Sequence, residues 1–150
     1  MYNKEFMDIA LMEAQLALSE NEVPVGAVIV KDNEIIAQGH NTREKSKNAL
    51  HHAEIIAIDK ACKALGGWRL WQCEMYITME PCPMCAGAIV NARIPKIYFG
   101  AYDKKYGGCG STVNLLQMKN NFKVDYEGGL EEEKSLELFN KFFEYLRNKK

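Results

Sequence analysis

Short apolar segments alternate with amphipathic helical segments along this 150-residue chain, and this alternation limits the available folds more than any other feature of the sequence. The predicted strands are residues 26–32, 33–41, 73–80 and 96–101, and the predicted helices are residues 3–20, 52–65, 81–92 and 130–150. Helices that alternate with strands pack against a sheet. We therefore predict an α/β fold in which helices cover both faces of a mixed central sheet of about five strands.

The segments between these elements carry signals of their own. Asp32 and Asn33 suit a tight hairpin turn between the first two strands, and Gly66 is expected to end the second helix. Residues 42–48 are predicted as a polar loop and residues 102–111 as a glycine-rich loop. Residues 112–121 are predicted as a short helix, and residues 122–128 as a fifth strand or an extended segment.

Composition bounds the class of protein. Hydrophobic residues make up 47% of the chain, which is enough for one compact domain over residues 1–150 without disulfides. The five cysteines are an odd number, and residues 1–21 carry charged side chains where a signal peptide would have an apolar core. No apolar run approaches the roughly 20 residues of a membrane span. These features predict a cytoplasmic protein with reduced thiols and no membrane association.

The net charge of −1 conceals an uneven distribution of charge along the chain. Residues 1–59 carry 5 basic and 10 acidic side chains, whereas residues 93–123 carry 6 basic side chains and one acidic side chain. The second segment could form a basic surface for phosphate groups, or it could be an ordinary solvated face. Charge alone favours the second interpretation.

Two pairs of polar residues fall at the predicted starts of two helices. His52 and Glu54 are two positions apart at one start, and Cys82 and Cys85 are separated by two residues at the other. The cysteine pair alone is compatible with two buried thiols, a redox pair, a structural zinc site or a catalytic zinc site. His52 favours the catalytic site, because three protein ligands leave the fourth zinc position open for water, whereas a structural site closes all four.

Glu54 has a separate expected role in this group. Helix N-termini stabilise anions such as thiolates, and residues two apart face one site only near a helix start. Zinc lowers the pKa of its bound water from 15.7 to about 7, but the reaction of that water still needs a group that moves protons. Glu54 is placed to do this without binding the metal. His51 is expected to face away from the metal, and Asn41 is either a turn residue or an amide that holds the edge of a heterocycle.

The chain resembles the bacterial-type tRNA-specific adenosine deaminases of the cytidine deaminase superfamily. The resemblance includes the H-x-E…P-C-x-x-C signature of that superfamily, formed by His52, Glu54, Pro81, Cys82 and Cys85. It covers most of the chain, and the match over residues 86–111 is more specific to the tRNA branch. The resemblance implies a three-layer α/β/α cytidine deaminase-like fold, one zinc ion per chain and a homodimer.

The resemblance also implies roles for individual residues. His52, Cys82 and Cys85 correspond to the zinc ligands, Glu54 to the proton shuttle, and Asn41 to the asparagine that holds the purine. The family also implies other substrate-binding positions. The base pocket is expected to be lined by Pro24, Val25, Ala53 and Met79. Asp103 corresponds to a loop residue near the anticodon sugar, and Phe143 and Arg147 correspond to residues of the last helix that approach RNA.

The predicted function is zinc-dependent hydrolytic deamination of adenosine to inosine at the wobble position of a tRNA anticodon. A zinc-activated hydroxide would attack purine C6 with Glu54 as the proton shuttle, and the tRNA anticodon stem-loop would present a base that is already partly unstacked. One alternative is a deaminase of a free base or nucleoside, such as guanine, cytosine or adenosine, which would share every metal residue. The other is a non-catalytic RNA-binding module with structural zinc, against which Glu54 and the lack of an obvious fourth ligand argue.

Overall fold

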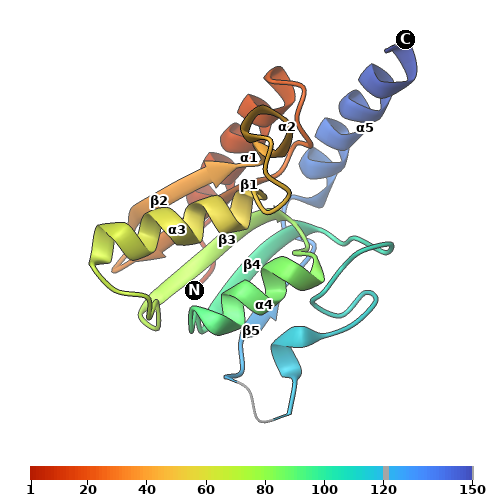
Figure 1. The fold of residues 1–150 in the computed structure, drawn as a ribbon. Coiled ribbons are helices and arrows are strands. Elements are labelled where there is room, and N and C mark those ends of the chain that lie inside the picture. The colour runs from red at the N-terminus through yellow and green to blue at the C-terminus, as the bar shows by residue number, and fades with distance from the viewer. Residues whose placement is uncertain (120–121, 150) are drawn as a thin grey trace.

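The computed structural model describes residues 1–119 and 122–149 and contains a mixed sheet of five strands in the order β2-β1-β3-β4-β5 (Figure 1). The strands are β1 (Gly26–Lys31), β2 (Glu34–His40), β3 (Cys73–Met79), β4 (Lys96–Ala101) and β5 (Asp125–Glu127). β1 pairs antiparallel with β2 and with β3, whereas β3, β4 and β5 are parallel to one another. The predicted mixed sheet is confirmed.

Helices cover both faces of this sheet (Figure 1). They are α1 (Lys4–Ser19), α2 (Arg43–Ser46), α3 (Ala53–Leu65), α4 (Pro83–Asn91) and α5 (Glu132–Asn148), with a 3₁₀ helix, η1, at Leu115–Gln117. α3 and α4 pack on one face around Ala57 and Met75, and α1 and α5 pack on the other around Met7, Tyr76 and Leu138. Met75 and Tyr76 are neighbours in β3 and enter different cores because strand side chains alternate between faces. The predicted three-layer α/β/α arrangement is confirmed.

Two predicted boundaries have a clear local cause. Asp32 and Asn33 have φ angles of 51° and 64°, and two successive residues with positive φ form the tight turn that joins β1 to β2. Gly66 ends α3 with a φ of 70°, a left-handed conformation that costs glycine little. Both the predicted hairpin turn and the predicted end of the helix are confirmed.

Residues 42–48, predicted as a polar loop, contain the short helix α2. The carboxylate of Glu22, which is 2% exposed, accepts hydrogen bonds from the backbone N–H groups of Glu44 and Lys45 at 3.0 and 2.8 Å. N–H groups at a helix start need partners from outside the helix, and Glu22 supplies them from a distant part of the sequence. The loop prediction was wrong because the cap is not local.

The two least regular segments are shorter than predicted. In residues 112–121 the helix is limited to the three residues of η1, and residues 120–121 lie outside the described part of the chain. Of the predicted fifth strand over residues 122–128, three residues form β5. No helix within residues 1–119 and 122–149 combines the length and the apolar character that a membrane span requires.

The strand pairing brings several chain segments to one edge of the sheet, here called the site edge. Gly26 at the start of β1 pairs with His40 at the end of β2, and Ala27 pairs with Ile77 near the end of β3. β4 runs parallel to β3 and so ends at the same edge. The segments before β1 and after β2, β3 and β4 therefore gather there, and α4 begins there because it follows β3 directly.

Candidate active site

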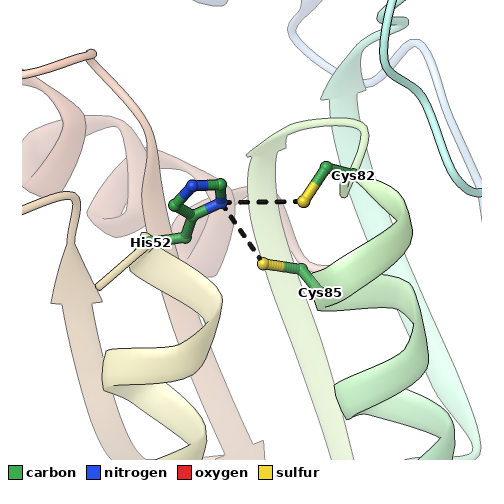
Figure 2. Close-up of side chains that lie close together, drawn as sticks. All are labelled: His52, Cys82 and Cys85. Carbon is green, nitrogen blue, oxygen red and sulfur yellow. Dashed lines mark hydrogen bonds between the residues drawn. The ribbon is translucent and has the colours of Figure 1, made fainter. Parts of the chain in front are cut away.

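The starts of α3 and α4 place an imidazole and two thiols side by side (Figure 2). His52 directly precedes α3 and Cys82 directly precedes α4, both with an extended backbone, and neither side chain caps its own helix. Cys85 lies in the first turn of α4. His52 Nδ1 is 3.6 Å from Cys82 Sγ and 3.6 Å from Cys85 Sγ, and the three donor atoms lie within 4.8 Å of one another. The three residues form one group that could hold a metal ion.

The electrostatics of this group favour a thiolate at Cys82. Its hydrogen bond with Cys85, followed by that with His52, lowers the pKa of Cys82 to about 4. The interaction with Cys82 and burial raise the pKa of the Cys85 thiol, and the hydrogen bond to Cys82 raises the pKa of His52. The start of α4 adds a partial positive charge beside both sulfur atoms. The group is therefore chemically suited to a soft cation.

Glu54 lies beside the group without belonging to it. It is the second residue of α3, is 4% exposed, and is not one of the metal-binding group found among the described residues. Burial, with a smaller contribution from the negative charge at Cys82, raises the pKa of the Glu54 carboxyl to about 7. A carboxyl group with a pKa near neutrality can both accept and donate a proton. These properties suit the proton-transfer role predicted for Glu54.

The other cysteines point elsewhere. The buried Cys109 thiol donates to the carbonyl oxygen of Pro81 at 3.9 Å, and the Cys62 thiol donates to the carbonyl oxygen of Trp68 at the same distance. Cys73 is buried at the start of β3. Within the described residues, none of these thiols belongs to the group that could hold a metal. Three ligands with one open position are typical of a catalytic zinc site and not of a structural one.

The residues predicted to surround the base follow the same topology. Pro24 and Val25 directly precede β1, Met79 ends β3, and Ala53 is the first residue of α3, between His52 and Glu54. Each therefore lies at the site edge or at the start of the helix that carries the imidazole. Their contact with a substrate stays a prediction.

Asn41 follows β2 at the site edge and is 5% exposed. Its backbone N–H donates to the carbonyl oxygen of Val25, which holds the two segments together. Its side-chain Oδ1 accepts a hydrogen bond from the backbone N–H of Arg43 at 2.9 Å. The amide was predicted either to form a turn or to hold a heterocycle by donating and accepting. Oδ1 takes part in the turn, and the contact of the amide with a heterocycle stays a prediction.

Asp103, the predicted contact to the anticodon sugar, lies in the loop after β4. Its Oδ1 accepts hydrogen bonds from the backbone N–H groups of Lys105 and Tyr106 at 3.1 and 3.0 Å, which fixes a tight turn. Lys104, Lys105 and Tyr106 are exposed on this turn, and Lys105 Nζ lies 5.2 Å from the centre of the Tyr106 ring. The carboxylate shapes the turn that displays two lysines and an aromatic ring.

The basic segment over residues 93–123 is not a continuous row of free cations. Arg93 donates to the carbonyl oxygens of Val90 and Asn91 at the end of α4, and Lys96 Nζ pairs with Glu127 at 3.9 Å. Lys104 and Lys105 are exposed and form no ion pair with any described residue. Lys119 and Lys123 are likewise exposed without an ion pair to a described residue. The turn after β4 therefore carries two of the four exposed, unpaired lysines of this segment.

Phe143 and Arg147 lie one helical turn apart on the second half of α5. Phe143 is 49% exposed, so it is not a core residue, and Arg147 is exposed as well. A cavity lined in part by Phe142, Glu22 and Lys45 separates this half of α5 from the end of α1 and from α2. Phe143 and Arg147 do not line this cavity, and neither belongs to the metal-binding group. Their contact with RNA stays a prediction.

One residue of the site, Glu80, was not singled out in the sequence. Glu80, directly after β3, is 2% exposed, and its carboxylate holds the loop after β4. A glutamate that ends an apolar strand is a usable signal, because a buried carboxylate needs several donors. His51, expected to face away from the metal, has a buried Nδ1 with no hydrogen-bond partner among the described residues.

Comparison with known proteins agrees with this fold and site. Residues 1–147 match the MafB19-like deaminase family. A tRNA-specific adenosine deaminase of Bacillus subtilis is 47% identical over 97% of this chain and 91% of its own length. A structure from a study of A-to-I editing by tRNA:A34 deaminases superimposes with a TM-score of 0.88 and 42% identity, over 91% of this chain and 99% of that chain. A guanine deaminase of Bacillus subtilis gives a TM-score of 0.65 and 32% identity, over 100% and 98%.

An α/β/α sandwich that presents one imidazole, two thiols and a buried carboxyl group at the starts of two helices defines a deaminase of the cytidine deaminase-like class. The chain belongs to the MafB19-like deaminase family and to the tRNA-specific adenosine deaminases. The resemblance expected from the sequence is confirmed.

Proposed function

We propose that this protein hydrolyses adenosine to inosine at the wobble position of a tRNA anticodon. The observation that carries the proposal is a three-ligand group with a buried carboxyl group beside it. The comparisons support adenosine in tRNA over a free base, because the likeness to a tRNA-specific adenosine deaminase, at 47% identity, exceeds the likeness to a guanine deaminase, at 32%. Both kinds of enzyme remove an amino group from a purine, so a direct assay must separate them.

Zinc is the metal that fits the donor atoms best. Zn–S and Zn–N bonds of about 2.3 and 2.0–2.1 Å at a tetrahedral angle require a nitrogen–sulfur separation of about 3.6 Å. His52 Nδ1 lies 3.6 Å from each of the two sulfur atoms. Two thiols and an imidazole are also the ligand types that zinc prefers. We therefore propose one zinc ion per chain, held by His52, Cys82 and Cys85.

The protein residues would act around that metal in distinct ways. Bound zinc would supply a water molecule whose pKa is lowered to about 7. Glu54 would accept a proton from the attacking water as the water oxygen bonds to C6, and would donate that proton to N1 of the purine. It would then move the second proton of that oxygen to the amino group, so that the C6–N bond breaks and ammonia leaves. Asn41 Nδ2 donates to the edge of the base. Burial raises the pKa of the Glu54 carboxyl to about 7, so the group can both accept and donate a proton.

The substrate-binding part of the proposal draws on the residues around this centre. Pro24, Val25, Ala53 and Met79 would form apolar walls for a flipped purine, and Asp103, Phe143 and Arg147 would meet the anticodon loop. The proposal includes a homodimer, which the family resemblance implies. It also includes a cytoplasmic location, which the five unpaired cysteines support because reduced thiols persist in that compartment.

The test of this function compares RNA with small substrates. The zinc-loaded protein is incubated separately with bulk tRNA, with free adenosine and with free guanine, and both inosine and ammonia are measured. We expect inosine in tRNA and little ammonia from either small molecule. Efficient ammonia release from guanine, with no inosine in tRNA, would show instead that the protein is a free-base deaminase.

Reversing the charge of Lys104 and Lys105 together is expected to weaken binding of an anticodon stem-loop. These lysines are exposed and unpaired among the described residues, and lysine contacts to phosphate release counterions, so affinity falls as salt rises. The double variant should therefore bind more weakly and with a shallower salt dependence. Zinc content is the control. Unchanged affinity and salt dependence would mean that the two lysines are only solvated surface.

Phe143→Ala is expected to weaken the same binding with a smaller change in salt dependence. Its ring is 49% exposed, and base–aromatic stacking contributes about 1–3 kcal/mol per base. Leu136→Ala on the first half of α5 is a matched control, because Leu136 is 43% exposed on the same helix. Equal affinities for wild type and the Phe143→Ala variant would remove Phe143 from the proposed RNA surface.

A further inference from the structure

The carboxylate of Glu80 is surrounded by hydrogen-bond donors from one loop, residues 102–111. Oε1 accepts from the backbone N–H of Asp103 at 3.0 Å and from the Ser111 hydroxyl. Oε2 accepts from the backbone N–H groups of Cys109 and Ser111, both at 3.1 Å. Glu80 is 2% exposed, so these four donors replace nearly all of the water around its carboxylate. One side chain therefore holds both ends of the loop.

The same loop packs directly against the turn that carries a metal ligand. Gly108 N–H donates to the carbonyl oxygen of Pro81 at 2.7 Å. A Cβ at Gly108 would lie 2.7 Å from the backbone nitrogen of Pro83, and a Cβ at Gly107 would lie 2.3 Å from Glu80 Oε2. Contacts that short are excluded, so only glycine allows this approach at either position. The loop therefore packs directly against residues 80–83, which include Glu80.

The outer part of this loop carries chemistry that suits RNA. Asp103 begins the turn that displays Lys104, Lys105 and the 59% exposed Tyr106, which together offer two cations and an aromatic ring. The backbone N–H of Asp103 is one of the donors to Glu80. The position of this turn relative to the metal-binding group therefore depends on the Glu80 carboxylate.

We propose that Glu80 is a positioning residue for RNA: its carboxylate fixes the loop over residues 102–111 so that Lys104, Lys105 and Tyr106 meet the RNA that flanks the reacting base. This inference rests on the proposed function, since it names what orders the RNA-binding surface of that same site. Glu80 touches neither the base nor the reacting atoms. Its effect is on the binding of the RNA around the base.

Replacing Glu80 with glutamine changes this arrangement selectively. An ionised carboxylate has two acceptor oxygens, whereas an amide has one acceptor oxygen and one NH₂ donor. The Cys109 and Ser111 N–H groups both face Oε2, so the amide oxygen is expected to take that position. The NH₂ group then faces the Ser111 hydroxyl, which can accept, and the Asp103 N–H, which cannot. Glu80→Gln thus releases Asp103 and leaves the rest of the loop attached.

The experiment measures steady-state deamination of an anticodon stem-loop by zinc-loaded protein. Loss of a hydrogen bond to a charged group corresponds to about tenfold or more in an equilibrium. We therefore expect Glu80→Gln to raise KM for the stem-loop about tenfold, with kcat changed less than about threefold, because a loop that binds RNA away from the reacting atoms affects binding alone. Glu13→Gln is the matched control, since Glu13 is another buried carboxylate and bonds Gln38 and His40, outside this loop.

A double-mutant cycle separates positioning from general destabilisation. If Glu80 acts by placing the two lysines, Glu80→Gln combined with the charge reversal of Lys104 and Lys105 raises KM by less than the product of the separate effects. A combined effect equal to that product would overturn the proposal. So would an unchanged KM, or a fall in kcat with no change in KM.

A second variant keeps the inference testable should Glu80→Gln fail to fold or lose zinc. Ser111→Ala removes the hydroxyl that holds Oε1, the oxygen that also accepts from the Asp103 N–H. The hold on Asp103 is thereby weakened, and we expect a KM rise of about threefold with kcat preserved. An unchanged KM for this variant would then decide against the proposal. Wild-type inosine formation is measured in the same assay, so failure of the proposed function is seen separately from failure of this inference.

Discussion

Replacing Glu54 with alanine is expected to lower turnover by at least about 10²–10⁴-fold while the protein keeps its zinc and its affinity for RNA. Glu54 is buried beside the ligand group, and its carboxyl pKa of about 7 suits the transfer of protons in both directions. Alanine removes the proton carrier without removing a ligand. The measurement is single-turnover inosine formation, together with zinc content and stem-loop affinity for each variant.

Glu54→Gln is the informative companion to this variant. Glutamine keeps the volume and polarity of the side chain but cannot exchange a proton, so its loss of turnover should match that of Glu54→Ala. A Glu54→Ala protein that had lost its zinc would contradict the account, because Glu54 would then be a ligand. Retention of nearly full turnover would equally rule out the proton-transfer role.

Replacing Cys82 or Cys85 with alanine is expected to reduce bound zinc from about one ion per chain to near zero, and to abolish activity. Both sulfur atoms lie 3.6 Å from His52 Nδ1, as a tetrahedral site with those ligands requires. Two remaining ligands hold zinc far more weakly than three. Metal analysis of protein purified without chelator measures the change directly, and circular dichroism shows whether the fold survives.

Cys109→Ala provides the matched control for the metal prediction. Cys109 is also a buried thiol near the site, but it donates to the Pro81 carbonyl oxygen and lies outside the ligand group. It should therefore retain zinc. Loss of zinc from Cys109→Ala, together with its retention in Cys82→Ala, would show that the ligand set is wrong.

Features that depend on local sequence were predicted well. Asp32 and Asn33 carry the left-handed conformations that a tight hairpin needs, and Gly66 carries the one that ends α3. Both follow from what these residue types tolerate in isolation. The convergence of His52 with Cys82 and Cys85 was expected from the residue types at two helix starts and from the family resemblance.

Features that depend on a distant partner were not predicted. The Glu22 carboxylate completes α2 from a position more than twenty residues earlier in the chain, and Glu80 holds a loop that begins after β4. The sequence shows that these residues are acidic, but only the fold shows that they are buried and which N–H groups they meet. The Oδ1 atom of Asn41 is a similar case, since only the fold shows that it accepts from the backbone N–H of Arg43.

The most direct test of wobble-adenosine deamination uses two anticodon stem-loops that differ only in where the adenosine lies. One carries it at the wobble position and the other at the neighbouring loop position, and each is digested to nucleosides after incubation with the zinc-loaded protein. We expect inosine from the first RNA alone, with none formed by the Glu54→Ala protein. Absence of inosine from both RNAs, with rapid release of ammonia from a free base or nucleoside, would contradict this expectation.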